Sequence, residues 1–143
     1  NIYSDFNWCY INRKQEDYDI HDLLSSPLIP TCSVLLRNDF QKTFPKWFYE
    51  IMSGDIGFFV LVIKDRKIKY LDECMSCYRK HKRGITRHHS PNKINLNRIY
   101  MFRKIDRYYN YKYRKTIKRT IIQHRKAIRN LLVKAESLAS GLF

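Results

Sequence analysis

The sequence predicts an α/β body followed by a basic, amphipathic helical tail. Short strand-like runs mix with helix-like segments through the first part of the 143-residue chain. From residue 99 onward, apolar residues recur every three or four positions, which is the spacing of an amphipathic helix. Most of the excess positive charge lies in that same stretch. We therefore divide the chain into a body at residues 1–90 and a tail at residues 91–143.

The body is divided by proline, glycine and polar turns, which bracket short segments of strand or helix composition. The segment Thr31–Arg37 has strand composition, and Pro45–Met52 begins with a proline that suits the first turn of a helix. Asp55 is a suitable N-cap for the helix that follows. The remaining expectations are a short helix or turn at 22–24, strands at 68–71 and 74–78, and a polar loop at 80–97.

The tail carries most of the charge. The whole chain has a formal net charge of +15, and residues 98–134 hold 13 Lys/Arg against one acid, Asp106. The apolar spacing indicates one amphipathic helix, or two with a break near Tyr108–Tyr111. The positive charge of such a helix favours an anionic partner. We rank an anionic membrane surface first, packing on the body or on a second copy next, and nucleic acid last.

The composition also limits the class of protein. No apolar run approaches the roughly 20 residues that span a bilayer, and no secretory signal opens the chain, so we expect a cytoplasmic protein, at most peripheral on the inner face of the membrane. The four cysteines are expected to be reduced. Cys74, Cys77 and His81, with His88 and His89, leave a zinc site open as an alternative, although a second ligand pair at a defined distance is missing.

The stretch Ile29–His81 reads, in order, IPTCSVLLR, FPKWFYEIMSGD and KIKYLDECMSCYRKH. This order resembles the acceptor-side half of bacterial family 2 glycosyltransferases, which have the GT-A fold. In that family a strand ending in Arg precedes a Pro-x-Trp helix, and a Gly-Asp at a helix start and a Tyr-Arg-x-His follow. The resemblance covers roughly residues 20–85 and implies inverting transfer of a sugar from a nucleotide diphosphate donor to a glycan or lipid-linked acceptor.

The resemblance also implies roles for individual residues. Asp55 matches the general base that takes the proton of the acceptor hydroxyl. Arg79 and His81 match the loop that assists the donor diphosphate or its metal, with His81 a candidate ligand of Mg²⁺ or Mn²⁺. Trp47 and Arg37 lie on the acceptor side, and for both the alternative is a structural role, burial in the core for Trp47 and bracing of the fold for Arg37.

The chain departs from the family in what precedes these motifs. It has no strand–helix alternation to form the nucleotide site, and we expect it to lack the metal-binding Asp-x-Asp of that half. Lys64-Asp65-Arg66-Lys67 also replaces the usual glycine turn. We therefore expect a fragment that needs a donor half, and whose uncovered surface favours self-association. The non-enzymatic alternative is a basic module that binds nucleic acid or an anionic membrane through its tail.

Overall fold

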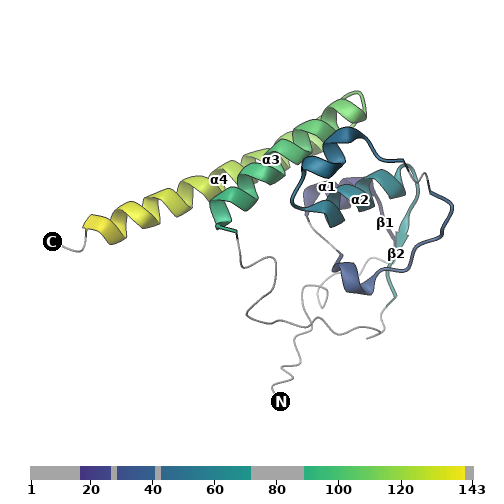
Figure 1. The fold of residues 1–143 in the computed structure, drawn as a ribbon, viewed down its shortest axis with the longest axis horizontal. Helices are drawn as coiled ribbons and strands as arrows, with labels where there is room; N and C mark the ends of the chain where they lie inside the picture. Colours follow the sequence, from purple (N-terminus) through teal and green to yellow (C-terminus); the bar gives the residue numbers. More distant parts are fainter. Residues whose placement is uncertain (1–16, 27–28, 41–42, 72–88, 141–143) are drawn as a thin grey trace, which may run out of the picture.

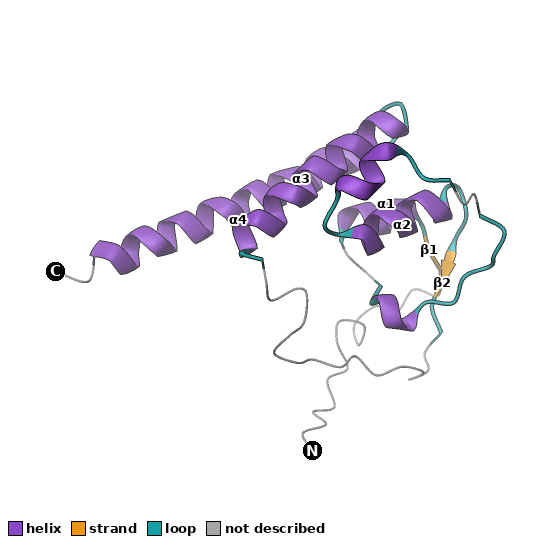
Figure 2. Ribbon diagram, in the orientation of Figure 1, coloured by secondary structure: helices purple, strands orange, loops and turns teal. Residues whose placement is uncertain are grey.

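A computed structural model describes residues 17–26, 29–40, 43–71 and 89–140, and it is mostly helical. Two long antiparallel helices lie beside a smaller part built from short helices and a two-stranded sheet (Figure 1). Figure 2 shows how little of the described chain is strand. The elements are β1 (Asp17–Tyr18), α1 (Ile20–Ser25), 3₁₀ helices at Thr31–Ser33 and Lys46–Glu50, α2 (Gly54–Ile63), β2 (Ile68–Lys69), α3 (Pro91–Tyr108) and α4 (Arg114–Ser140).

Strands and helices are thus mixed in the body, as predicted, but the sheet is small. β1 and β2 pair antiparallel, with Tyr18 opposite Ile68. The strand expected at Thr31–Arg37 was wrong, because the segment forms a 3₁₀ turn and then an extended, exposed run in which Leu35 is 93% exposed. A strand forms when a neighbour satisfies its backbone groups, and no described segment pairs with this one.

Helix α2 lies at the centre of the body. It is apolar all round, as expected of a helix with neighbours on every side, and its buried residues are Ile56, Gly57, Phe59, Val60, Leu61, Val62 and Ile63. The helix begins two residues earlier than predicted. Ser53 occupies the N-cap position and Asp55 is the second helical residue, so the prediction of Asp55 as N-cap was wrong. The helix expected over Pro45–Met52 is present as the shorter 3₁₀ helix.

The short helix α1 has a well-formed N-terminus. The Asp19 carboxylate accepts hydrogen bonds from the backbone N–H groups of His21 and Asp22, at 2.7 and 3.2 Å. The Asp22 carboxylate accepts one in return from the Asp19 N–H, at 2.9 Å, which completes a capping box. These bonds fix the helix so that Leu23 and Leu24 are buried in the core.

The tail forms two helices, and the break between them lies near Tyr108–Tyr111, as the spacing of the apolar residues allowed. The connection 109–113 reverses the chain by placing Asn110 and Tyr111 at φ 47° and 63°. The loop predicted to reach residue 97 was wrong in its second part, because α3 already begins at Pro91. Proline suits the first position of a helix, and the Ser90 hydroxyl caps it by accepting from the Lys93 N–H at 3.3 Å.

The tail helices and the body share one hydrophobic core. Its members from the tail are Met101, Phe102, Ile105, Tyr113 and Ile117. Several hydrogen bonds join the parts. In two of them Thr120 Oγ1 donates to the Leu24 carbonyl at 2.6 Å, and the Tyr109 hydroxyl donates to the Val60 carbonyl at 2.8 Å. The division at residue 90 therefore does not separate two cores. Because the two helices are antiparallel, the C-terminal part of α4 extends past the N-terminal end of α3, and α3 does not accompany it there (Figure 1).

Candidate functional site

Asp55 stands at the exposed start of α2. Its Oδ1 accepts a hydrogen bond from the Ile56 N–H at 2.9 Å, and its Oδ2 accepts one from the Thr31 hydroxyl at 3.3 Å. A carboxylate in the first turn of a helix is stabilised in its charged form by the helix dipole. The Thr31 contact brings together two stretches that the sequence singled out, Ile29–Arg37 and the Gly54-Asp55 pair. The result is a solvent-accessible carboxylate held in a defined orientation.

Helix α3 fixes the chain just before Asp55. The Asn97 side-chain oxygen accepts a hydrogen bond from the Met52 N–H at 2.7 Å, and the Tyr100 hydroxyl donates to the Glu50 carboxylate. On the other side, a Cβ atom at Gly57 would collide with the end of the Ile51 side chain, so α2 approaches this segment closely. These contacts place the start of α2 against α3.

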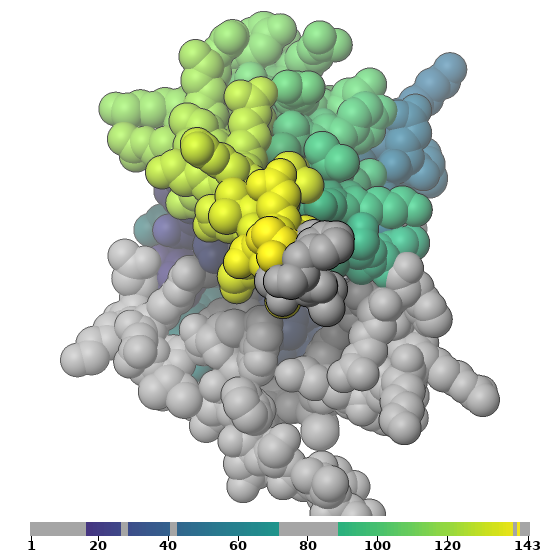
Figure 3. All heavy atoms as spheres, turned by 90° about the vertical axis from the view of Figure 1, so that its left-hand side faces the viewer, coloured from purple at the N-terminus to yellow at the C-terminus, as the bar shows by residue number. Residues whose placement is uncertain are grey.

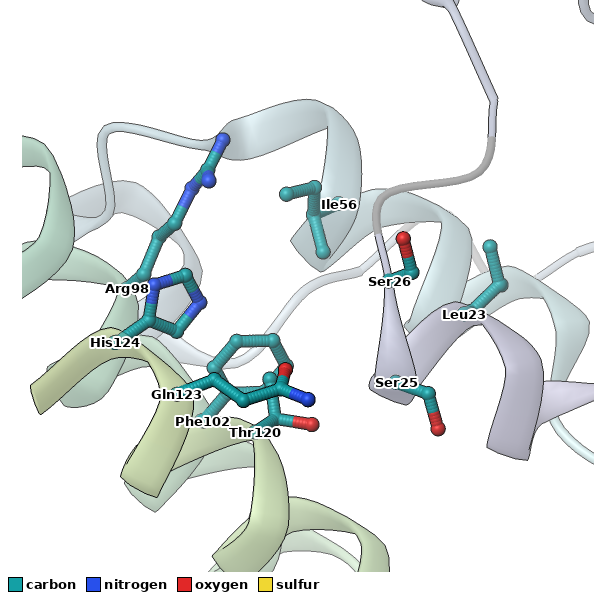
Figure 4. Close-up of a pocket in the computed structure, with 9 residues that line it drawn as sticks. All are labelled: Leu23, Ser25, Ser26, Ile56, Arg98, Phe102, Thr120, Gln123 and His124. Carbon is teal, nitrogen blue, oxygen red and sulfur yellow. The ribbon is translucent and has the colours of Figure 1, made fainter. Parts of the chain in front are cut away.

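A shallow pocket of about 120 Å³ opens beside this start, between α1, α2, α3 and α4 (Figure 4). The residues that line it are Leu23, Ser25, Ser26, Ile56, Arg98, Phe102, Thr120, Gln123 and His124. Leu23 and Ile56 lie on one side of the pocket with Ser25 and Ser26, and the other side carries the guanidinium of Arg98, the imidazole of His124 and the side-chain amide of Gln123. Such a mixture suits a small polar or anionic group.

Arg98 is the charged residue of the pocket. It is half-buried, and its buried Nε makes no hydrogen bond with any described residue. Burial lowers the pKa of Arg98, while the negative charge of Asp55 raises it in opposition. The two residues are therefore electrostatically coupled, with the positive charge of Arg98 near the Asp55 carboxylate.

His124 faces the same pocket from α4. Its ring stacks on Phe102, with the centroids 5.8 Å apart, and its Nδ1 lies 2.7 Å from the Asn95 side-chain oxygen. An amide oxygen only accepts, so Nδ1 carries the proton, and Figure 4 shows the other ring nitrogen pointing toward the pocket. Burial, and then the charge of Arg98, lower the pKa of His124. The imidazole is therefore neutral at pH 7, and no described residue donates a hydrogen bond to its other nitrogen.

The other residues expected in a site lie apart from Asp55 or outside the described chain. Trp47 is 9% exposed and packs edge-on against Tyr108, which fits the core role that the sequence left open for it. Arg37 is exposed and lies near Asp39, whose pKa is lowered mainly by its bond to Arg66 and slightly by Arg37. Arg79 and His81 lie outside the described residues.

Arg98 and His124 were missed by the sequence analysis, although a signal existed. Arg98 precedes Phe102 by one helical turn, so it occupies the core-facing stripe of α3. His124 holds the same kind of position on α4, between Thr120 and Ile128. Polar residues on an otherwise apolar stripe mark either a satisfied structural contact or a site, and here both face one pocket.

The expected absence of an Asp-x-Asp triplet was wrong, because Asp17-Tyr18-Asp19 is one. Both of its carboxylates have structural partners: Asp17 pairs with Lys67 at 3.3 Å, and Asp19 caps α1. Asp55 itself is accompanied by one hydroxyl and a nearby arginine, a donor set too poor in oxygen for Mg²⁺ or Mn²⁺. Within the described ranges no three His, Cys, Asp or Glu residues converge, and the cysteines and His81 of the zinc alternative lie outside them.

No family model, curated protein or solved structure matches the chain. Among the helices of the described residues, none has the length and apolarity to cross a bilayer.

Proposed function

We propose that the chain is the acceptor side of an inverting glycosyltransferase of the GT-A type, which moves a sugar from a nucleotide diphosphate to a glycan or lipid-linked acceptor. The observation that supports this most directly is the contact between Thr31 and Asp55. It joins two motifs of the family resemblance at an exposed carboxylate. The order of the motifs along the chain supports the proposal further.

In this proposal Asp55 is the general base. Its carboxylate takes the proton of an acceptor hydroxyl while that oxygen bonds to the anomeric carbon of the donor sugar. The bond from that carbon to the diphosphate oxygen breaks in the same step, and the nucleoside diphosphate leaves with the electron pair. Asp55 suits the role because it is accessible and because the Ile56 N–H and the Thr31 hydroxyl orient its carboxylate.

The donor half would bind the nucleotide and hold the divalent cation that offsets the charge of the diphosphate, since the described residues around Asp55 do not fit such an ion. Arg98 has a positioning role: its charge beside Asp55 and its place in the pocket favour an anionic or hydroxyl-rich acceptor group.

The test is Asp55→Asn, made in the chain joined to its donor half and assayed for sugar transfer from a panel of nucleotide sugars. Loss of the base should lower kcat by about 10²- to 10⁴-fold. The donor should still raise the melting temperature, because the variant leaves the nucleotide site intact.

Asp65→Asn is the matched control, since Asp65 is an exposed carboxylate just beyond the other end of α2. It should transfer sugar at the wild-type rate. Equal rates for Asp55→Asn and the wild-type enzyme would rule out Asp55 as the base. A panel in which no nucleotide sugar changes the melting temperature would count against glycosyl transfer altogether.

A further inference from the structure

Helix α4 has two faces of different character. One is packed on the rest of the molecule: Ile117 and Thr120 are buried, and His124, Ile128 and Leu131 are half-buried. The steps of three and four between them place these side chains on one stripe. The opposite face points to solvent, and we call it the outer face of α4.

The outer face is cationic. Its charged residues are all exposed, and they are Arg114, Lys115, Lys118, Arg119, Arg125, Lys126 and Arg129. None of them makes an ion pair with any described residue. At 1.5 Å per residue they extend over about 22 Å of helix. The unneutralised charge is therefore arranged as a straight strip along one side of the molecule.

Aliphatic side chains are exposed among these cations. Ile122 is 50% exposed and lies one turn from both Lys118 and Lys126 on the same face. Val133, one turn beyond Arg129, is 55% exposed. In the C-terminal part of α4, Leu132 and Leu138 are 51% and 74% exposed. Figure 3 looks toward this C-terminal end of α4, which lies at the surface of the molecule.

We propose that the outer face of α4 docks the chain on an anionic phospholipid membrane. Lysine and arginine side chains bind the headgroup phosphates, while Ile122 and Val133 enter the boundary between headgroups and acyl chains. The cationic strip supplies the charge complementarity, and the aliphatic side chains within it gain from leaving water. The proposal does not depend on glycosyl transfer.

The structure favours a membrane over a nucleic acid. Binding of single strands relies on exposed aromatic rings that stack with bases. Of the four tyrosines near the helix break, Tyr113 is 4% exposed and Tyr109 donates its hydroxyl to a buried backbone carbonyl. Tyr108 and Tyr111 are exposed, but both lie before α4 begins and so outside its cationic outer face. A nucleic acid would also leave Ile122 and Val133 in water. The apolar stripe of α3 is in the core, and its exposed cations, Lys93, Arg103 and Arg107, are fewer than the seven on the outer face of α4.

The first experiment places a reporter at the surface. Ile122→Trp in the full 143-residue chain is mixed with vesicles of phosphatidylglycerol and phosphatidylcholine, and tryptophan fluorescence is recorded. Its emission should shift to the blue with these vesicles and stay unchanged with pure phosphatidylcholine. Leu35→Trp is the control, because Leu35 is 93% exposed and is not part of α4. A shift that is equal in both variants, or absent in both, would overturn the proposal.

The second experiment removes charge. The triple variant Lys118→Gln, Arg125→Gln and Lys126→Gln should bind the anionic vesicles about 100-fold more weakly, taking about fivefold for each cation near the surface. The matched control changes three exposed lysines outside α4, Lys46, Lys69 and Lys93, to Gln, and should lose far less. Both variants should keep the wild-type helical circular dichroism. Equal losses would show non-specific attraction to net charge and would overturn the proposal.

A third experiment uses single-stranded RNA to decide whether the partner is a membrane or a nucleic acid. Ile122→Asn with Val133→Asn should weaken vesicle binding several-fold and leave RNA binding unchanged, because only the bilayer takes up the apolar side chains. If the full chain binds RNA more tightly than the vesicles at the same salt concentration, and the double variant binds vesicles as the wild type does, the partner is a nucleic acid and the proposal fails.

Discussion

Lys64 occupies a backbone conformation that glycine adopts more easily. It follows α2 with φ 46° and ψ −115°, in a turn closed by the Arg66 N–H and the Ile63 carbonyl at 2.7 Å. A residue with a Cβ in such a conformation costs about 1–3 kcal/mol. Glycine removes that strain but makes the unfolded chain more flexible, which offsets about 0.4–1 kcal/mol. From the sequence, Lys64-Asp65-Arg66-Lys67 stands where the resembled family has a glycine turn, but the strain at Lys64 is visible only in the backbone angles.

Lys64→Gly should therefore raise the free energy of unfolding by about 1 kcal/mol, measured by urea denaturation. Lys64→Ala provides the comparison, since alanine keeps the Cβ and the strain while removing the same charge. It should leave the free energy of unfolding close to the wild-type value. An equal gain from both variants would assign the effect to charge and not to the backbone.

His124 should make the stability depend on pH. Burial and Arg98 lower its pKa in the folded state below the ordinary 6.5, so the unfolded state binds the proton more readily. This contribution is fully present above pH 6.5 and is lost as the pH falls toward the folded-state pKa. The free energy of unfolding should fall between about pH 7 and pH 5, and His124→Gln should flatten that slope.

The titration of His124 can be followed directly by NMR through its ring Hε1 signal. The midpoint should lie below 6.5, and Arg98→Gln should raise it, because the positive charge beside the imidazole is gone. A midpoint at or above 6.5 in the wild-type chain would contradict the buried position of this residue.

At the scale of elements, long periodic segments were predictable and short ones were not. The spacing of apolar residues in the tail predicted one helix or two with a break near Tyr108–Tyr111, and two are present. A long amphipathic stripe has few alternative structures. Thr31–Arg37 has the composition of a strand, but strand formation depends on a pairing partner elsewhere in the chain. Local sequence does not carry that information.

The candidate site was predictable only where local sequence marks it. Asp55 stands out locally, beside a glycine and before an apolar helix. Arg98 and His124 reach its neighbourhood only because α3 and α4 fold back onto the body. Their proximity depends on the tertiary structure. The sequence shows only that each is a polar residue on an otherwise apolar stripe of its helix.

For the molecule as a whole, the shared core makes the tail a structural part of the body. A chain ending at residue 90 loses Met101, Phe102, Ile105, Tyr113 and Ile117, and burial of each large apolar side chain stabilises by about 1.5–3 kcal/mol. Because domains of this size are stable by only about 5–15 kcal/mol, this truncated chain should show no cooperative thermal unfolding.

A chain ending at Leu131 is the contrasting case, since the described side chains beyond it are exposed. Its melting temperature should stay within a few degrees of the wild-type value, because surface residues contribute little to stability. If residues 1–90 unfold cooperatively on their own, the body has a core that does not need the tail.

The hydrogen bond from Thr120 to the Leu24 carbonyl joins residues 96 positions apart. By contrast, α3 and α4 are linked by a connection of only five residues and meet after a short search. The hairpin can therefore assemble early, whereas the closure of α1 onto α4 must bring together distant parts of the chain. During synthesis, α1 and α2 leave the ribosome long before the helices that cover them. Until α4 is complete, their apolar surfaces have no native partner, and this interval is when the chain is most exposed to aggregation and to chaperones.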